Sequence, residues 1–379
     1  MIKKIVVASD SFKGTMDSIQ VCSIVEEGIR NILQDVEIVK IPIADGGEGT
    51  VDAFLSAFGG EKINVTVQGP LFQDVVASYG ILKDGRTAVI EMAEASGLIL
   101  AGEDKNPCLT TTFGTGQLIR NALDNCCETI IIGIGGSATN DGGIGMAAAL
   151  GVRFLDCNAG EVPLTGGGLG NICSIDVSDM DCRIKGCKFI VACDVDNPLY
   201  GPNGAAYVYS PQKGADAEMV QLLDRNLKHY ADVVQRDLGI DMQAVPGSGA
   251  AGGLGGGLYA FLGGVMMSGI NIILDRINFD GIINNTDLII TGEGRIDGQS
   301  LRGKVPVGIA NRARKAGIPV IALVGDIGNG TDAIHETGIT AIFSINRTAM
   351  DYPKIKAYSP EYLLKTVEEL IRFANCFNR

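Results

Sequence analysis

The sequence has 379 residues, of which 46 % are hydrophobic and 20 % charged, so the chain can bury a substantial core and is not an intrinsically disordered protein. Its formal net charge of −13 argues against binding to nucleic acid or to an anionic membrane surface, because both attract mainly Lys and Arg. Glycine is about twice as frequent as the usual ~7 %, and its 52 residues cluster between apolar runs, which predicts many tight loops.

The first elements alternate between strand and helix. Residues 5–9 and 36–41 are short, mainly apolar runs, the first continuous, and this is typical of buried parallel strands. Between them, Asp17 and Gln20 form a capping-box pattern, and apolar residues at helical spacing follow it. A strand, a helix and a strand in this order predict parallel pairing through a right-handed crossover.

A different pattern occupies residues 62–92. Apolar residues there alternate with polar or small ones in three runs. Gly69-Pro70 and Asp84-Gly85 separate these runs as turns. This segment therefore predicts an antiparallel meander and the start of a second domain.

The remaining elements return to a strand and helix alternation. The expected strands are 129–134, 189–193, 288–291, 320–324 and 341–345; the expected helices are 116–126, 144–150, 217–238, 305–316 and a last one capped by Ser359. We predict a discontinuous, doubly wound, Rossmann-like parallel-sheet domain and an inserted mixed α/β domain. The first takes residues 1–61, 108–151 and 285–379, and the second takes 62–107 and 152–284.

The cellular compartment is predicted from three negative features. The apolar run after Met1 is too short for a signal peptide, and no run approaches the ~18 apolar residues of a membrane-spanning helix. The ten cysteines are scattered and suggest no disulfide framework. We therefore expect a cytoplasmic protein.

Neither His229 nor His335 lies near a cysteine cluster, which argues against a zinc site.

Polar, glycine-flanked loops follow four of the predicted strands. Ligands of doubly wound sheets bind at the carboxyl ends of the strands, so we expect these loops to converge on one crevice, where backbone amides can bind anions. A single loop of this kind is more often a tight turn, but four loops with ionisable residues favour a functional site. They comprise residues 9–15, 42–50, 133–143 and 291–298.

Two nucleotide-binding motifs are matched only formally. The Gly-x-Gly-x-x-Ala sequence at 133–138 resembles a dinucleotide fingerprint with Asp156 downstream, but residues 140–143 would keep the loop open where the helix should begin. The segment 298–304 resembles a P-loop, but Val305 replaces the hydroxyl residue that holds magnesium, and the preceding strand is expected to end too early. Lys304 is then either a phosphate ligand or a solvated surface lysine.

Six motifs, in order along nearly the whole chain, resemble those of the type I bacterial glycerate kinases. They are Asp-Ser-Phe-Lys-Gly (10–14), Ala-Asp-Gly-Gly-Glu-Gly-Thr (44–50), Gly-Ile-Gly-Gly-Ser-Ala-Thr-Asn-Asp-Gly-Gly (133–143), Ala-Cys-Asp-Val-Asp-Asn-Pro-Leu (192–199), Pro-Gln-Lys-Gly-Ala (211–215) and Thr-Gly-Glu-Gly-Arg-Ile-Asp-Gly-Gln (291–299). The resemblance implies a two-domain fold, ATP with Mg²⁺ and phosphorylation of D-glycerate. It favours 2-phosphoglycerate over 3-phosphoglycerate as the product, a choice that residue spacing itself does not indicate.

The residue chemistry agrees with a kinase. Phosphoryl transfer requires positioning and charge neutralisation, a carboxylate that accepts the hydroxyl proton, and carboxylates that hold Mg²⁺. Neither histidine lies in a motif, so the base is an Asp or a Glu. Lys13 and Arg295 are the only cations within the strand-end loops and could bind a carboxylate or a phosphate, although ion pairs with neighbouring carboxylates are an alternative. The carboxylate candidates are Asp10, Asp45, Glu48, Asp194, Glu293 and Asp297.

These candidates receive working roles, while the division between base and metal ligands stays open. We assign Lys13, Asp297 and Asp10 to catalysis; Asp45, Glu48 and Arg295 to substrate binding; Gly135, Gly136, Ser137, Asn140, Gly292, Gly294 and Lys304 to ATP; and Asp194 and Glu293 to Mg²⁺.

Two other functions fit part of the sequence. An NAD-dependent hydroxy-acid dehydrogenase would use the dinucleotide-like motif, and a non-catalytic glycerate-binding regulator would keep Lys13 and Arg295. The regulator would also be expected to carry a basic DNA-binding element, which the acidic composition disfavours. The expected partners are small molecules, with a homodimer left open as the oligomeric state.

Overall fold

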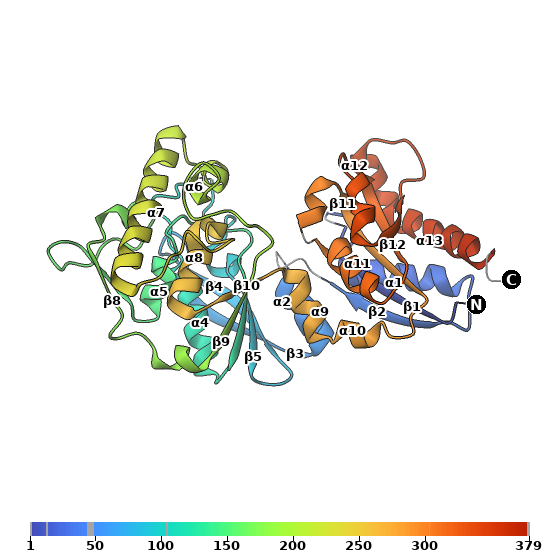
Figure 1. The fold of residues 1–379 in the computed structure, drawn as a ribbon, viewed down its shortest axis with the longest axis horizontal. Coiled ribbons are helices and arrows are strands. Elements are labelled where there is room, and N and C mark those ends of the chain that lie inside the picture. Colours follow the sequence, from blue (N-terminus) through green and yellow to red (C-terminus); the bar gives the residue numbers. More distant parts are fainter. Residues whose placement is uncertain (1, 13, 44–48, 104, 303, 377–379) are drawn as a thin grey trace. The chain divides into compact units, whose positions relative to one another are not determined.

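The computed structural model describes residues 2–12, 14–43, 49–103, 105–302 and 304–376. The chain forms two compact units. The first comprises Met1–Asp45 and Gly269–Arg379, and the second comprises Gly46–Ser268. Figure 1 shows both chain termini on the first unit. The expected combination of a discontinuous parallel α/β domain and an inserted mixed α/β domain is confirmed.

The first unit contains a five-stranded, wholly parallel sheet in the order β13-β12-β11-β1-β2. The order reverses between β1 and β11, because the chain adds β2 on one side of β1 and β11 to β13 on the other. The strands are β1 (Lys4–Ser9), β2 (Glu37–Pro42), β11 (Leu288–Ile296), β12 (Val320–Ile327) and β13 (Ile339–Ser344).

Helices cover both faces of this sheet. Apolar residues of α1 and α13 pack on Ile5 and Val7 of β1 in one buried cluster, and α11 contacts β1 and β11 from the other face. The predicted capping box of Asp17 and Gln20 starts α1 and is confirmed. The helices are α1 (Ser18–Arg30), α9 (Gly269–Arg276), α10 (Phe279–Ile282), α11 (Val305–Lys315), α12 (Tyr352–Ile355) and α13 (Ser359–Cys376), with 3-10 turns η5 (Gly298–Arg302), η6 (Asp332–Thr337) and η7 (Lys356–Tyr358).

The second unit is built on a six-stranded mixed sheet in the order β10-β9-β6-β5-β4-β3. The predicted antiparallel meander is confirmed as β3, β4 and β5. Its strands are β3 (Gly60–Gln68), β4 (Asp74–Leu82), β5 (Thr87–Glu91), β6 (Thr129–Gly133), β9 (Lys188–Ala192) and β10 (Val265–Met267), with a separate hairpin of β7 (Arg153–Leu155) and β8 (Ser174–Asp176). Its helices are α2 (Thr50–Phe58), α3 (Ala93–Ser96), α4 (Phe113–Asp124), α5 (Ile144–Ala149), α6 (Ala205–Tyr209), α7 (Ala217–Leu238) and α8 (Leu254–Leu262), with 3-10 turns η1 (Leu169–Asn171), η2 (Cys182–Gly186), η3 (Pro211–Lys213) and η4 (Ala250–Gly253).

The boundaries between the units differ from those expected from the sequence. Segment 108–151 was expected in the parallel domain, but its strand β6 pairs with β5 and β9 of the second sheet. Residues 49–61, with α2 and the start of β3, and residues 269–284, with α9 and α10, also change unit. The physical reason is that the apolar run of β6 is buried on both faces, and such a strand fits the interior of either sheet equally well.

Two elements of the first unit also differ in detail. The motif 291–298 was expected to follow a strand, but β11 continues through it as far as Ile296, pairing with β12. Ser359 lies inside α13 rather than before it, because η7 leads directly into this helix, and its hydroxyl donates to the carbonyl of Ile355.

Cys157 and Cys173 form a disulfide beside the β7–β8 hairpin, which corrects the expectation that the cysteines form no disulfide.

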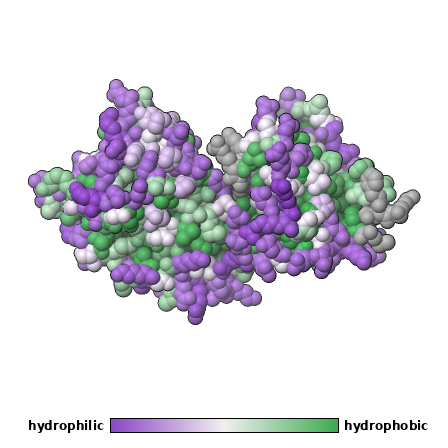
Figure 2. Space-filling model, viewed as in Figure 1, coloured by the Kyte–Doolittle hydropathy of each residue, from purple (hydrophilic) through white to green (hydrophobic). Residues whose placement is uncertain are grey.

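Figure 2 shows hydrophilic side chains over much of the surface in view, with apolar side chains in smaller patches between them. Among the described residues, no helix is both long enough and apolar enough to cross a membrane.

Candidate functional site

The strand order of the first unit defines the place where a ligand is expected. In open parallel sheets, a crevice forms at the carboxyl ends of the two strands between which the strand order reverses. Those strands are β1 and β11. Asp10 directly follows β1, and Glu293 lies in the carboxyl-terminal half of β11. The structure therefore brings together two of the acidic residues that the sequence singled out.

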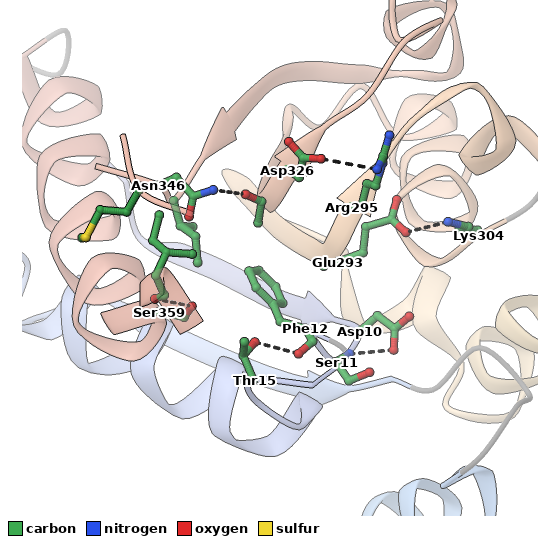
Figure 3. Close-up of a pocket in the computed structure, with 15 residues that line it drawn as sticks. Asp10, Ser11, Phe12, Thr15, Glu293, Arg295, Lys304, Asp326, Asn346 and Ser359 are labelled. Carbon is green, nitrogen blue, oxygen red and sulfur yellow. Dashed lines mark hydrogen bonds and ion pairs between the residues drawn. The ribbon is translucent and has the colours of Figure 1, made fainter. Parts of the chain in front are cut away.

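A cavity of about 600 Å³ opens at this edge of the sheet, and Figure 3 shows its lining. Its volume lies within the range of about 300–1,000 Å³ that is typical of small-molecule sites. It is lined by Asp10, Ser11, Phe12, Thr15, Glu293, Gly294, Arg295, Lys304, Gly325, Asp326, Ile345, Asn346, Met350, Ile355 and Ser359.

Asp10 is held rigidly at the end of β1. Its backbone N–H donates to the carbonyl of Gly292 on β11 at 3.0 Å, which continues the contact between the two strands. Its carboxylate Oδ1 accepts the backbone N–H of Ser11 at 2.6 Å, and the residue is only 6 % exposed. A carboxylate fixed at the cavity wall can accept a proton or contribute to a metal site.

Glu293 is a buried carboxylate that makes one hydrogen bond and one ion pair. Its Oε1 accepts the hydroxyl of Ser300 at 2.8 Å, and its Oε2 lies 3.4 Å from Nζ of Lys304. Burial raises the pKa of Glu293, and the nearby ammonium of Lys304 partly opposes that rise. Lys304 therefore lies at the cavity and points at a carboxylate, so the solvated-surface alternative for this lysine does not describe its surroundings.

Arg295 lies between two carboxylates at the solvent side of the cavity. Its Nε is 3.5 Å from Oδ2 of Asp297, and its Nη1 is 3.6 Å from Oδ2 of Asp326. The ion pairs named in the sequence analysis as the alternative to substrate binding are thus present. Arg295 and Asp326 line the cavity. Asp297 adjoins it through Arg295 and through Ser300, whose hydroxyl accepts the backbone N–H of Asp297 and donates to Glu293.

The glycines of β11 differ in what they do. A Cβ at Gly292 would lie 2.5 Å from the carbonyl oxygen of Leu323 and 3.2 Å from Cε1 of Phe12, so only glycine allows this close packing. Gly294 lines the cavity, and Gly292 does not.

The P-loop resemblance is tested by the same elements. One reason given against it was wrong, because β11 ends at Ile296, shortly before the 3-10 turn η5. The other reason holds, because Val305 begins α11 with a fully buried side chain that has no hydroxyl. The dinucleotide-like motif also lacks its helix, since α5 begins at Ile144.

The loop 133–143 of the second unit combines exposed glycines with buried polar side chains. Gly135 and Gly136 are exposed at the end of β6. Ser137 is largely buried and accepts a hydrogen bond from Lys213 at 3.3 Å. Asn140 is fully buried, and its Oδ1 accepts the hydroxyl of Ser210 at 2.9 Å. The side chains of Ser137 and Asn140 are therefore held within this unit.

Lys213 is a cation that the sequence analysis missed. Its side chain is 2 % exposed, and Nζ donates to the carbonyl of Thr139 at 2.6 Å. Burial lowers the pKa of Lys213 to about 7, against a smaller opposing effect of Asp141. Asp141 accepts hydrogen bonds from Thr112 and from the loop amides, while burial raises its pKa. The motif 211–215 was the available signal, and its buried lysine ties η3 to the loop after β6.

Comparison with known proteins places the chain in a family. A sequence model described as the glycerate kinase family matches residues 5–375. The chain belongs to the glycerate kinase family. It is 53 % identical over 343 residues to a protein named glycerate kinase in Bacillus cereus, covering 90 % of each chain, and 49 % identical over 343 residues to one named glycerate 2-kinase in Escherichia coli K12, again 90 % of each. A crystal structure of a protein designated glycerate kinase 2 from Salmonella typhimurium LT2 superposes with a TM-score of 0.90 and 43 % identity over 100 % of both chains.

The remaining predicted site residues of this glycerate kinase family member are Lys13, Asp45, Glu48 and Asp194. Lys13, Asp45 and Glu48 lie outside the described residues. Asp194 follows β9 in the second unit, and its side chain is half-buried. Among the described residues, no group of three or more His, Cys, Asp or Glu side chains forms a ready-made metal centre.

Proposed function

We infer that this chain is a glycerate kinase, which transfers the terminal phosphoryl group of ATP to glycerate. The observation that carries this inference is the match of the glycerate kinase family over residues 5–375, with relatives of that name at 44–53 % identity. The cavity at the strand-order reversal, with carboxylates and Lys304 in its wall, supports the same chemistry. This inference takes the place of the dehydrogenase and regulator alternatives.

We propose 2-phosphoglycerate as the product. The support is the name of the Escherichia coli relative, glycerate 2-kinase, together with the motif resemblance. The proposed substrate is the D-isomer, on the same resemblance.

The roles of the chain's own residues follow from charge and position. We propose that Asp10, buried at the cavity wall, accepts the proton of the attacking hydroxyl, because general bases must lie within reach of that proton. Asp297 is a second candidate, because it adjoins the cavity through Arg295 and Ser300. Lys304 would neutralise charge on the nucleotide phosphates, since its ammonium reaches the cavity beside Glu293.

Mg²⁺ is the expected companion of ATP, and the residues present fit it. Mg²⁺ prefers oxygen ligands and is commonly held by one or two carboxylates together with substrate phosphates, so a complete protein cage is not required. Glu293 supplies such a carboxylate at the cavity, and Asp194 is the second proposed ligand. The ion would neutralise the phosphate charge during transfer.

The remaining residues are proposed to bind glycerate and ATP. Arg295 is proposed to bind the carboxylate of glycerate, in exchange for one of its two present ion pairs. Gly135, Gly136, Gly292 and Gly294 are proposed to bring the backbone close to ATP, with Gly294 supported by its place in the cavity. Ser137 and Asn140 are proposed as nucleotide-binding residues, although their internal hydrogen bonds fit a support for the loop better. Lys13, Asp45 and Glu48 keep their proposed roles in catalysis and substrate binding.

A cytoplasmic location and a homodimer complete the proposal. The kinase function fits a compartment that supplies ATP, whereas the Cys157–Cys173 disulfide is more usual in oxidising compartments. Thiol titration of freshly isolated protein and light scattering in solution test these two points.

The function is tested by coupled ADP release. We expect turnover that requires D-glycerate and is abolished by EDTA and restored by added Mg²⁺. Enolase alone should then consume the product, because it acts on 2-phosphoglycerate and not on 3-phosphoglycerate. Turnover with NAD and a hydroxy acid, without glycerate-dependent ADP release, would contradict the inference.

A further inference from the structure

The cavity of the first unit has two chemically different ends. Figure 3 shows Asp10, Glu293 and Lys304 on one side and Asn346 and Ser359 on the other, with Phe12 between them. The charged end carries the groups to which the kinase mechanism was assigned. The other end lies beyond Phe12 and has no role in that mechanism.

The second end has an apolar wall built by three elements. Phe12 follows β1, Ile345 follows β13, and Ile355 ends α12; all three are at most 4 % exposed. Met350 adds a flexible side chain that is 39 % exposed and lines the same cavity. An aromatic ring, two branched side chains and a thioether form a surface suited to a flat, apolar ring system.

The amide of Asn346 lies at this end in a fixed orientation. Its Nδ2 donates to the carbonyl of Gly325 at 2.6 Å, and this bond decides which amide atom is the nitrogen. One Nδ2 hydrogen therefore remains, and within the described part of the chain no donor reaches Oδ1. An amide that offers one donor and one acceptor side by side is the group that pairs with N6 and N7 of adenine.

The loop that carries Asn346 is anchored before any ligand arrives. The backbone N–H of Ile345 donates to the carbonyl of Val324 at 2.8 Å. The hydroxyls of Thr348 and Tyr362 lie 2.8 Å apart and connect the loop to α13. A preformed wall binds more tightly than one that must become ordered on binding.

We propose that this end of the cavity binds the adenine ring of the nucleotide, with Asn346 contacting its N6 and N7 edge. Phe12, Ile345, Met350 and Ile355 surround the ring, and the phosphate chain runs past Phe12 toward Lys304. The proposal rests on the proposed function, because it locates the nucleotide of that reaction. Glycerate, a three-carbon acid with little apolar surface, matches neither the volume of this cavity nor its apolar end.

The experiment measures nucleotide affinity and kinetics in parallel. Binding of a fluorescent ADP analogue and its displacement by ADP need no glycerate and no turnover. We expect Asn346→Ala to weaken ADP binding and to raise the KM for ATP at least tenfold, with the KM for glycerate changed less than twofold. Met350→Ala should weaken ADP binding several-fold. Because Oδ1 would oppose the O6 atom of guanine, Asn346→Ala should also reduce the preference for ATP over GTP.

The control is Asn311→Ala, which removes an exposed amide on α11 outside the cavity. It should leave all constants within twofold. Equal ADP affinity in Asn346→Ala, Met350→Ala and the wild type would overturn the proposal, as would a rise in the KM for glycerate alone. Wild-type protein that binds ADP but does not phosphorylate glycerate would refute only the proposed function, and protein that does not bind ADP would refute both.

Discussion

The segments 133–143 and 291–299 carry the two longest polar motifs of the chain, yet their surroundings differ. The first is a loop after β6, and the second lies largely within the end of β11. In the first unit, Glu293 and Lys304 face a cavity and contact each other there. In the second unit, Ser137, Asn140 and Lys213 are buried. Lys213 donates a hydrogen bond to Ser137, and Asn140 accepts one from Ser210. Glycine-flanked polar residues at the end of a strand can thus form either an open site or a buried support. Only the packing around the segment decides between them.

This comparison predicts where substitutions should affect chemistry and where they should affect folding. Substitutions of residues at the cavity should lower the enzyme's activity and change its stability only slightly. The buried lysine of the second unit should change stability and its dependence on pH.

The largest loss of activity is expected from Asp10→Asn. The amide keeps an oxygen that can accept the N–H of Ser11, but it cannot accept the proton of the substrate hydroxyl. Loss of a general base typically costs about 10²–10⁴-fold in rate, so we expect kcat to fall by that amount with Tm nearly unchanged. Asp332→Asn, at an exposed position on η6, is the matched control. Wild-type kcat in Asp10→Asn would move the base to Asp297.

A smaller loss is expected from Lys13→Ala. A cation that meets the transferring phosphate contributes about a hundredfold or more to kcat/KM, as oxyanion donors do. Arginine should restore little activity, because its planar group does not replace a compact charge. Steady-state kinetics of Lys13→Ala and Lys13→Arg measure this; near-normal values would direct the search for the cation to Arg295 or Lys304.

Lys304→Ala should affect both activity and stability. The change leaves the buried carboxylate of Glu293 without its cation, so its pKa rises further above the unfolded value. A carboxyl group with a raised folded-state pKa is destabilising above that pKa and neutral in effect below the unfolded value. The loss of Tm should therefore be larger at pH 8 than at pH 4.5.

The expected size of that loss is modest. An unpaired buried partner costs about 1–3 kcal/mol, and the partly exposed Lys304 places this contact at the lower end. About 2–4 °C of Tm corresponds to each kcal/mol in a domain of this size. Calorimetry at both pH values measures it, with Lys315→Ala on α11 as the control. An equal loss at the two pH values would show that the Glu293–Lys304 contact is not electrostatic in effect.

The smallest effect is expected from Lys213→Met, in the slope of stability against pH. The pKa of Lys213 is lowered to about 7 in the folded protein, so between that value and its ordinary pKa the unfolded chain binds the extra proton. Stability then rises with pH in this window. Lys213→Met should flatten the rise of Tm between pH 7 and pH 9, whereas the exposed Lys185→Met should leave it unchanged. An unaltered slope in Lys213→Met would assign the rise to other groups.

The sequence predicted the individual elements better than their assembly. The capping box of α1, the meander β3–β5 and the long helix α7 depend on local periodicity and were correct. The sheet that receives β6 could not be predicted, because an all-apolar strand carries no information about its neighbours. β11 extends through Gly292 and Gly294 since pairing with β12 outweighs the low strand propensity of glycine.

The sequence singled out residues at only the charged end of the candidate cavity. Asp10, Glu293 and Arg295 lie in recognisable motifs and line the cavity. Ile345, Asn346 and Met350 follow β13 without any motif, and only the fold brings them to Phe12. Lys213 escaped notice because it lies far in the sequence from the loop that it supports, and Cys157 and Cys173 because their pairing depends on the β7–β8 hairpin.

The central claim is that this chain phosphorylates glycerate, and ³¹P nuclear magnetic resonance observes the transfer directly. With ATP, Mg²⁺ and D-glycerate, we predict that the γ-phosphate signal of ATP decays while a phosphomonoester coupled to the proton on C2 appears at the same rate. Under the same conditions, Asp10→Asn should show neither the decay of the γ-phosphate signal nor the new phosphomonoester. Decay of ATP to free phosphate only, or no decay at all, would contradict the account.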